Sequence, residues 1–177
     1  MFAICRVIVG VSGSPRNLPT VRYAAELARG QGVTLTPVLA WVPPGGDMAE
    51  RRHPSSHLRR AWAQDARERL HDAVNAAIGG IPADLITELL LAIRGEAGWV
   101  LVQEASRAGD LLVIGTGRHG SVGRLVGGKV SRYCLARAGC PVLAIPPTTL
   151  ELEAGHGLHG WAFRHRGLSL SELTADR

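Results

Sequence analysis

The chain has 177 residues and a formal net charge of +5, and 46% of its residues are hydrophobic. This length is typical of one domain with an extension, and the apolar fraction is sufficient for a core. No apolar run approaches the roughly 18 residues of a membrane span, and Arg6 interrupts the short apolar start, unlike in a secretory signal. Three cysteines without framework spacing indicate free thiols in a reducing compartment, so we expect a cytoplasmic protein.

The first part of the chain predicts a strand, a helix and a second strand. Residues 5–11 are almost all apolar, which is typical of a parallel strand that is covered on both faces. Residues 19–30 carry small apolar side chains at helical spacing, and Gly30 and Gly32 are expected to end this helix. The next apolar run, residues 33–41, predicts the second strand.

The middle of the chain begins with a polar segment. Residues 42–56 are rich in Pro and Gly and predict a long loop. Ser56, or the serine before it, is expected to cap a second helix that runs to about Ile78 on an apolar stripe. A third strand is predicted over residues 84–93, and a third helix over residues 96–107.

The following part combines a glycine-rich turn with unbalanced charge. An apolar strand (residues 111–114) is followed by a glycine-rich turn (residues 115–128), a helix that contains Tyr133, and a strand (residues 142–145). Residues 111–150 include no Asp or Glu but five cations: Arg118, Arg124, Lys129, Arg132 and Arg137. Because backbone N–H groups at a helix N-terminus favour an anion, this unit predicts a phosphate-bearing ligand.

Two general phosphate-binding patterns overlap this turn. Residues 115–120 satisfy G-x-G-x-x-G directly after a strand, as in dinucleotide folds. That motif requires an acidic residue about 20 positions later, but the next acid after Asp110 is Glu151. Residues 123–129 fit G-x-x-x-x-G-K, but Val130 stands where a phosphate loop needs Ser or Thr. Neither pattern therefore identifies the ligand.

The alternation of strands and helices predicts a single doubly wound α/β domain. Right-handed crossovers give a flavodoxin-like, five-stranded parallel sheet in the order 3-2-1-4-5. The strand order reverses between the first and fourth strands, and residues 12–14 and 115–128 leave the carboxyl ends of these two strands. We expect this domain to comprise residues 1–147, and residues 148–177 to form an apolar C-terminal tail that docks on its own domain or reaches a partner subunit.

The order of motifs resembles that of the universal stress proteins of the UspA type. The resemblance covers residues 5–147 and rests on VIVGVSGSP, ELARGQG, VTLTPVLAW and GGKVSRYCLARAGCPVLAIPP. Nucleotide-binding members carry G-x-x-G, nine residues and then G-[ST], and their first strand usually ends in Asp. Aligned from Gly115, Arg118 falls on the second glycine, Lys129 on the Ser/Thr, and Ser12 on the Asp.

The resemblance implies a stress-response module that binds ATP or AMP at the glycine-rich loop. The implied nucleotide-binding residues are Val11, Ser12, Gly13, Ser14, Ala40, Gly115, Arg118, Gly128, Lys129 and Val130. It also implies a homodimer that pairs along the edge strand, Val142 to Ile145. The alternative is a family member without nucleotide that acts through dimerisation and protein contacts.

Other functions are less well supported by the sequence. No Ser-His-Asp arrangement or acid–base pair is suggested by position, so no catalytic residue is predicted. His53, His57 and His71 have no ligand spacing, and His156 and His159 are spaced as metal ligands on a helix, but the glycines around them disfavour that helix, so no metal site is predicted. Few aromatic residues and no known nucleic-acid motif argue against nucleic acid as a partner.

Overall fold

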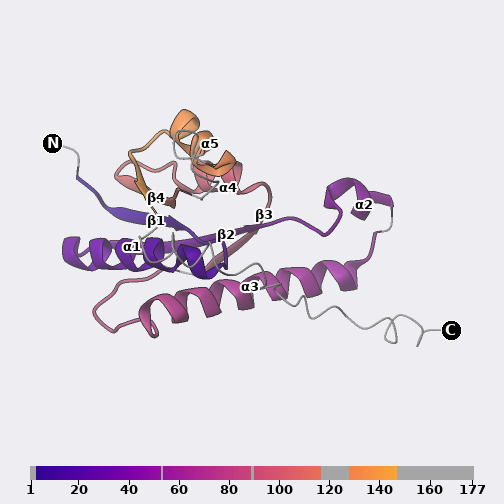
Figure 1. The fold of residues 1–177 in the computed structure, drawn as a ribbon, viewed down its shortest axis with the longest axis horizontal. Helices are drawn as coiled ribbons and strands as arrows, with labels where there is room; N and C mark the ends of the chain where they lie inside the picture. The colour runs from indigo at the N-terminus through magenta and orange to yellow at the C-terminus, as the bar shows by residue number, and fades with distance from the viewer. Residues whose placement is uncertain (1–2, 53, 89, 117–127, 147–177) are drawn as a thin grey trace, which may run out of the picture. The chain divides into compact units, whose positions relative to one another are not determined.

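The computed structural model describes residues 3–52, 54–88, 90–116 and 128–146. These residues form one five-stranded parallel sheet in the order β3-β2-β1-β4-β5 (Figure 1). The strands are β1 (Arg6–Gly10), β2 (Thr34–Trp41), β3 (Leu91–Arg94), β4 (Asp110–Gly115) and β5 (Val142–Ile145). The predicted α/β class and strand order are therefore confirmed.

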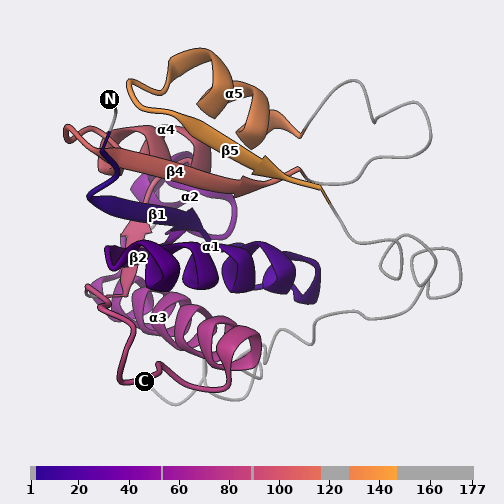
Figure 2. The ribbon, with the colours of Figure 1, turned by 90° about the vertical axis from the view of Figure 1, so that its left-hand side faces the viewer.

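Helices cover both faces of the sheet. They are α1 (Leu18–Gln31, preceded by the 3-10 turn Pro15–Asn17), α3 (Ser56–Ile78), α4 (Ala97–Glu104) and α5 (Lys129–Arg137). A further helix, α2 (Gly46–Arg52), lies at the carboxyl end of β3, to which it is joined through Arg94. Figure 2 shows α1 and α3 on one face, with α4 and α5 on the other. Each face is closed by an apolar layer, because side chains along a strand point alternately to the two faces. Val7 and Val9 pack towards α1 and α3, whereas Ile8 packs towards α4 and α5.

The ends of the first two long helices follow the predicted signals. Helix α1 extends one residue past Gly30 and ends at Gly32, whose positive φ of 65° is the conformation that a glycine adopts readily. The side chain of Ser55 accepts a hydrogen bond from the N–H of Leu58 and so caps α3.

The predicted loop over residues 42–56 is wrong in part, because it contains helix α2. Asp47 lies in the first turn of α2 and Arg51 in its last turn, which matches the direction of the helix dipole. The Pro and Gly residues that predicted a loop lie before this helix, at its first residue Gly46, and after it.

The predicted third strand is too long. Only Leu91–Arg94 forms β3, although residues 86–88 before it also run alongside β2. The N–H of Leu35 donates to Ile86 O (2.8 Å), and the N–H of Glu88 donates to Leu35 O (3.0 Å). Leu35 pairs with Thr87 and Val38 with Leu91, so the β3 segment has one more residue than β2 between these pairs. An extra residue interrupts a strand ladder, as in a β-bulge.

None of the helices that the structure describes is both long and apolar enough to cross a membrane.

Candidate functional site

The strand order reverses between β1 and β4, and the carboxyl ends of these two strands lie next to each other. The two strands pair in parallel, with Val9 opposite Val113. In open parallel sheets, ligands bind beyond the carboxyl ends of the strands at this position. The loop after β1 and the segment after β4 both leave from this edge, as the sequence predicts.

The side chain of Asn17 holds the loop after β1. Its Oδ1 accepts a hydrogen bond from the N–H of Ser12 (3.0 Å), and its Nδ2 donates to Gly10 O (3.2 Å). Gly13 adopts a φ of 70°, which other residues rarely adopt. The hydroxyl oxygens of Ser12 and Ser14 lie 3.0 Å apart in a hydrogen bond. The loop therefore presents two neighbouring hydroxyl groups at the end of β1.

Gly115, the last residue of β4, is the point at which three elements meet. A Cβ atom on Gly115 would lie 2.9 Å from Thr20 Oγ1 and 3.6 Å from Asn17 Nδ2. The buried Ser131 hydroxyl of α5 donates to Gly115 O (3.1 Å). The β1 loop, the start of α1 and the first turn of α5 thus converge on Gly115, where Thr20 leaves no room for a side chain.

The N-terminus of α5 offers groups that suit an anion. Its N-cap is Gly128, which has no side chain that could cap the N–H groups of the first turn. The N–H groups of the first turn of a helix carry partial positive charge and bind anions. Lys129 is exposed beside them, and Val130 is also exposed. Arg118, the remaining predicted residue on this side, lies outside the described residues.

The two apolar residues predicted to contact a base do not share a surface. Val11 is buried and belongs to the apolar layer beneath α1 and α3. Ala40 is half-buried and packs on the opposite layer, beneath α4 and α5. The N–H of Val11 donates to Val38 O, so both residues nevertheless lie near the carboxyl ends of the same two strands.

The sequence analysis missed Asn17, Thr20 and Ser131. Each of them contacts the backbone of a loop or an element that is distant in the chain. The hydrophobic pattern of the sequence does not indicate such contacts. One signal could have been used, because Asn side chains in turns bind nearby backbone groups.

The cysteines are free thiols in the described residues, and Cys134 belongs to the core. Burial, together with the neighbouring Cys140, raises the pKa of the Cys134 thiol to about 11. A thiol with such a pKa is protonated at neutral pH and is a poor nucleophile or metal ligand. Within the part of the chain that the structure describes, no three His, Cys, Asp or Glu residues gather as a possible metal site.

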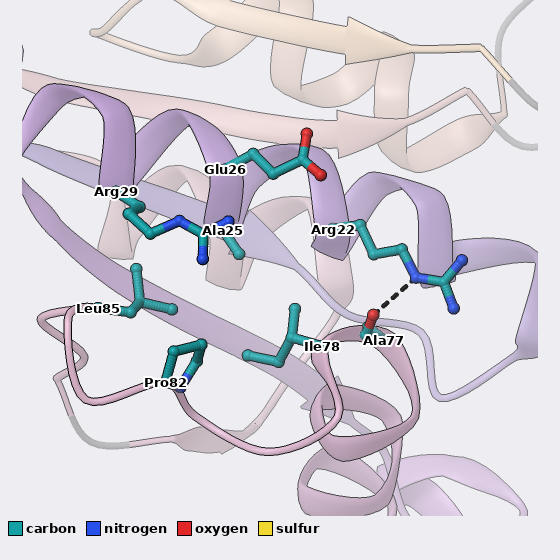
Figure 3. A pocket seen from close by; sticks show the side chains of 8 residues that line it. All are labelled: Arg22, Ala25, Glu26, Arg29, Ala77, Ile78, Pro82 and Leu85. Carbon is teal, nitrogen blue, oxygen red and sulfur yellow. Dashed lines mark hydrogen bonds between the residues drawn. The ribbon is translucent and has the colours of Figure 1, made fainter.

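A shallow pocket of about 220 Å³ lies elsewhere, between α1, the end of α3 and the loop that follows it (Figure 3). Ile78, Pro82 and Leu85 form its apolar side. Its arginines already have partners: Arg22 Nε donates to Ala77 O (2.6 Å), and Arg29 lies 3.9 Å from Asp84. The pocket contains none of the predicted site residues, so the edge at β1 and β4 remains the candidate site.

Comparison with protein families identifies one family. The model of the Universal stress protein family matches residues 4–146. Universal stress proteins of Mycobacterium tuberculosis and Mycobacterium bovis are each 26% identical to this chain over 148 residues, which is 81% of this chain and 48% of theirs. The chain thus spans about half the length of these curated relatives.

Solved structures share the same architecture. A universal stress protein in complex with cAMP is 26% identical, with a TM-score of 0.55, and the match covers 82% of this chain and 99% of that one. The universal stress protein of Archaeoglobus fulgidus in complex with dAMP is 24% identical, with a TM-score of 0.53 and the same coverage. Because the family model matches most of its length and the sheet is shared with these structures, the chain belongs to the universal stress protein family.

Proposed function

We propose that this chain binds an adenine nucleotide, ATP or AMP, at the carboxyl ends of β1 and β4, and that it serves as a cytoplasmic stress-response module. The observation that carries the proposal is the junction at Gly115, which Asn17 and Thr20 approach from one side and Ser131 from the other. The relative with cAMP bound, at 26% identity, supports an adenine nucleotide as the class of ligand. The free cysteines are consistent with a reducing cytoplasm.

In this proposal the phosphates lie over residues 115–128, with Lys129 or Arg118 beside them. The first-turn N–H groups of α5 donate to phosphate oxygens, and the lysine ammonium acts as a point charge. The base lies beyond the end of β2, close to the backbone of Val11 and Ala40, whose side chains face opposite sides of the sheet. The groups that converge at the site are hydroxyls, an amide and backbone N–H groups. These groups bind phosphate and sugar, so we propose a binding module and assign no catalytic residue.

Removing the ammonium group tests the proposal. Lys129→Ala is expected to weaken ATP binding by about 1–3 kcal/mol, because a charge-assisted hydrogen bond to phosphate is lost. Isothermal titration calorimetry with ATP and with AMP measures the change. The effect should be larger for ATP, which places more negative charge along the loop.

The matched control is Arg137→Ala, which removes one exposed cation from the opposite end of α5. It should leave nucleotide affinity unchanged, although it removes the contact of the guanidinium with the Tyr133 ring. If Lys129→Ala binds both nucleotides as wild type does, Lys129 is only a surface charge and the site is degenerate.

The second candidate function is a family member that acts without nucleotide, through dimerisation and protein contacts. Strand β5 is the edge strand next to β4, and all four of its residues are only half-buried. An accessible edge of this kind can pair with another strand. This function also agrees with Ser12 and Lys129, which depart from the nucleotide-binding motif. Calorimetry that detects no adenine nucleotide binding would favour it.

A further inference from the structure

The loop after β1 differs chemically from a loop that holds an unmodified ribose. Ser12 Oγ lies 3.0 Å from Ser14 Oγ and accepts a longer hydrogen bond from the N–H of Ser14 (3.4 Å). Each hydroxyl donates one proton and accepts two, so the pair retains one O–H that can donate to a ligand. Asn17 fixes this geometry through the N–H of Ser12. The loop therefore presents uncharged donors where a carboxylate would present only acceptors.

No acidic residue lies near this loop along the chain. The first acidic residue of the chain is Glu26, so β1, its loop and the first half of α1 contain no carboxylate. Arg16 is exposed within the 3-10 turn that follows Ser14. On α3, the Cβ of Arg69 would lie 3.8 Å from a Cβ built on Gly13. Arg16 thus follows the hydroxyl pair in the chain, and the base of the Arg69 side chain lies beside the loop.

Arg69 is paired with Asp65 at 2.9 Å, and both side chains are largely exposed. Exposed ion pairs of this kind contribute little to the free energy of unfolding, so a phosphate can compete with Asp65 for the guanidinium. Arginine binds a phosphate group through two parallel N–H···O hydrogen bonds. A carboxylate on the loop would repel that phosphate, but the loop has none. The surface pair with Asp65 therefore does not exclude Arg69 from binding a ligand.

In α/β dinucleotide sites, a carboxylate binds the free hydroxyl groups of a ribose, whereas an arginine accommodates a ribose that carries a phosphate. Resting on the nucleotide site proposed above, we infer that the loop of Ser12, Ser14 and Arg69 selects an adenine nucleotide with a phosphate on its ribose. The 5′-phosphate lies at Gly115 and the first turn of α5, and the ribose phosphate accepts hydrogen bonds from the one free O–H of the serine pair and from Arg69.

The probes are AMP, ADP and adenosine 3′,5′-bisphosphate, with adenosine 2′,5′-bisphosphate to distinguish the two ribose positions. ADP controls for the number of phosphate groups, because it carries its second phosphate on the 5′ side. Calorimetry with the full chain should give an affinity for one bisphosphate about tenfold or more above those for AMP and ADP, as expected for one or more charge-assisted hydrogen bonds.

Ser12→Asp should reverse this preference, because the carboxylate repels the ribose phosphate and accepts from free ribose hydroxyls. Arg69→Gln should reduce the preference about tenfold without adding a negative charge. The matched control is Arg67→Gln, which removes a cation from an exposed position of the same helix. It should leave the ratio of affinities unchanged.

The outcomes separate this inference from the function on which it rests. If the bisphosphates and ADP bind alike and Ser12→Asp leaves their ratio unchanged, the ribose-phosphate inference is overturned and the nucleotide site stands. If none of the four nucleotides binds, the proposed function falls and the inference falls with it.

Discussion

Arg6 and Asp110 lie on neighbouring strands and form an ion pair that is almost completely buried. The guanidinium donates from Nε and Nη2 to the two carboxylate oxygens, at 2.9 and 2.8 Å, and from Nη2 also to Glu104 O. The hydrogen bond with Asp110 raises the pKa of Arg6 despite its burial. Asp110 also accepts from the N–H of Arg107, so the pair ties together the amino ends of β1 and β4.

Breaking this pair at one residue should be costly. Asp110→Ala leaves the Arg6 charge buried without its main partner, and we expect it to lower the free energy of unfolding by about 3–5 kcal/mol. Urea denaturation measures the loss. Asp72→Ala, which removes an exposed carboxylate from α3, is the control. A loss at Asp110 no larger than that of the control would show that the pair contributes little.

Among the elements, α2 is held in place by charge. Glu50 of α2 has a side chain that is only 4% exposed, and it accepts hydrogen bonds from Arg59 Nε of α3 (2.6 Å) and from Arg94 at the end of β3. Arg94 also donates to Asp47 Oδ1 (2.6 Å). Three elements are thus joined at the carboxyl ends of β2 and β3.

This cluster makes the stability of α2 depend on pH. The hydrogen bond from Arg59, and then the charges of Arg59 and Arg94, lower the pKa of Glu50, and the hydrogen bond from Arg94 lowers that of Asp47. A carboxylate with a lowered pKa in the folded state stabilises the fold above its unfolded pKa, roughly 4, and loses this contribution as pH falls through the folded pKa. The stabilisation is therefore present at neutral pH and lost in acid.

Limited proteolysis between pH 7 and pH 3, with a protease active over that range, tests this dependence. Glu50→Gln should expose residues 46–52 to cleavage at pH 7, and its difference from wild type should disappear towards pH 3. Glu26→Gln, an exposed carboxylate on α1, is the control and should resemble wild type throughout. Equal protection of wild type and Glu50→Gln at pH 7 would contradict the role of the cluster.

The sequence predicted those elements whose hydrophobic pattern and end signals agree. Apolar runs located β1, β2, β4 and β5, and Ser55 located the start of α3. Helix α2 was missed because its ends are rich in Pro and Gly, and its stability comes from ion pairs with Arg59 and Arg94. Strand β3 was overextended because the apolar pattern continues through the extra residue that interrupts its pairing with β2.

The candidate site was predicted only in outline. Ser12, Gly115 and Gly128 follow from the motif and from the strand order, which brings the ends of β1 and β4 together. The contacts of Asn17 and Ser131 depend on distances between elements, which no local pattern encodes. The division of the chain at Pro147 and the role of Arg118 remain predictions, because these residues lie outside the described ones.

For the molecule as a whole, we predict a homodimer that pairs along β5. Pro141 and Pro146 bracket this edge strand and limit pairing to a short patch with two-fold symmetry. Such a patch is small, so we expect the apolar residues of the tail to enlarge the interface. These residues are Leu152, Leu158, Trp161, Phe163, Leu168 and Leu170.

Light scattering on the full chain and on a chain that ends at Pro147 tests both parts of this prediction. The full chain should be a dimer at micromolar concentration, and the shortened chain should dissociate more readily. A monomeric full chain would contradict the dimer, and an equally tight shortened dimer would exclude the tail from the interface.

The central claim, an adenine nucleotide at the carboxyl ends of β1 and β4, is tested most directly by titrating AMP into isotope-labelled protein and following backbone amide signals by NMR. We predict that the largest shifts occur at Ser12, Gly13, Gly115 and Lys129, and that Gly109, at the opposite end of β4, shifts little. Shifts confined to Arg22, Glu26 and Leu85, which line the pocket of Figure 3, or no shifts at millimolar AMP, would contradict the claim.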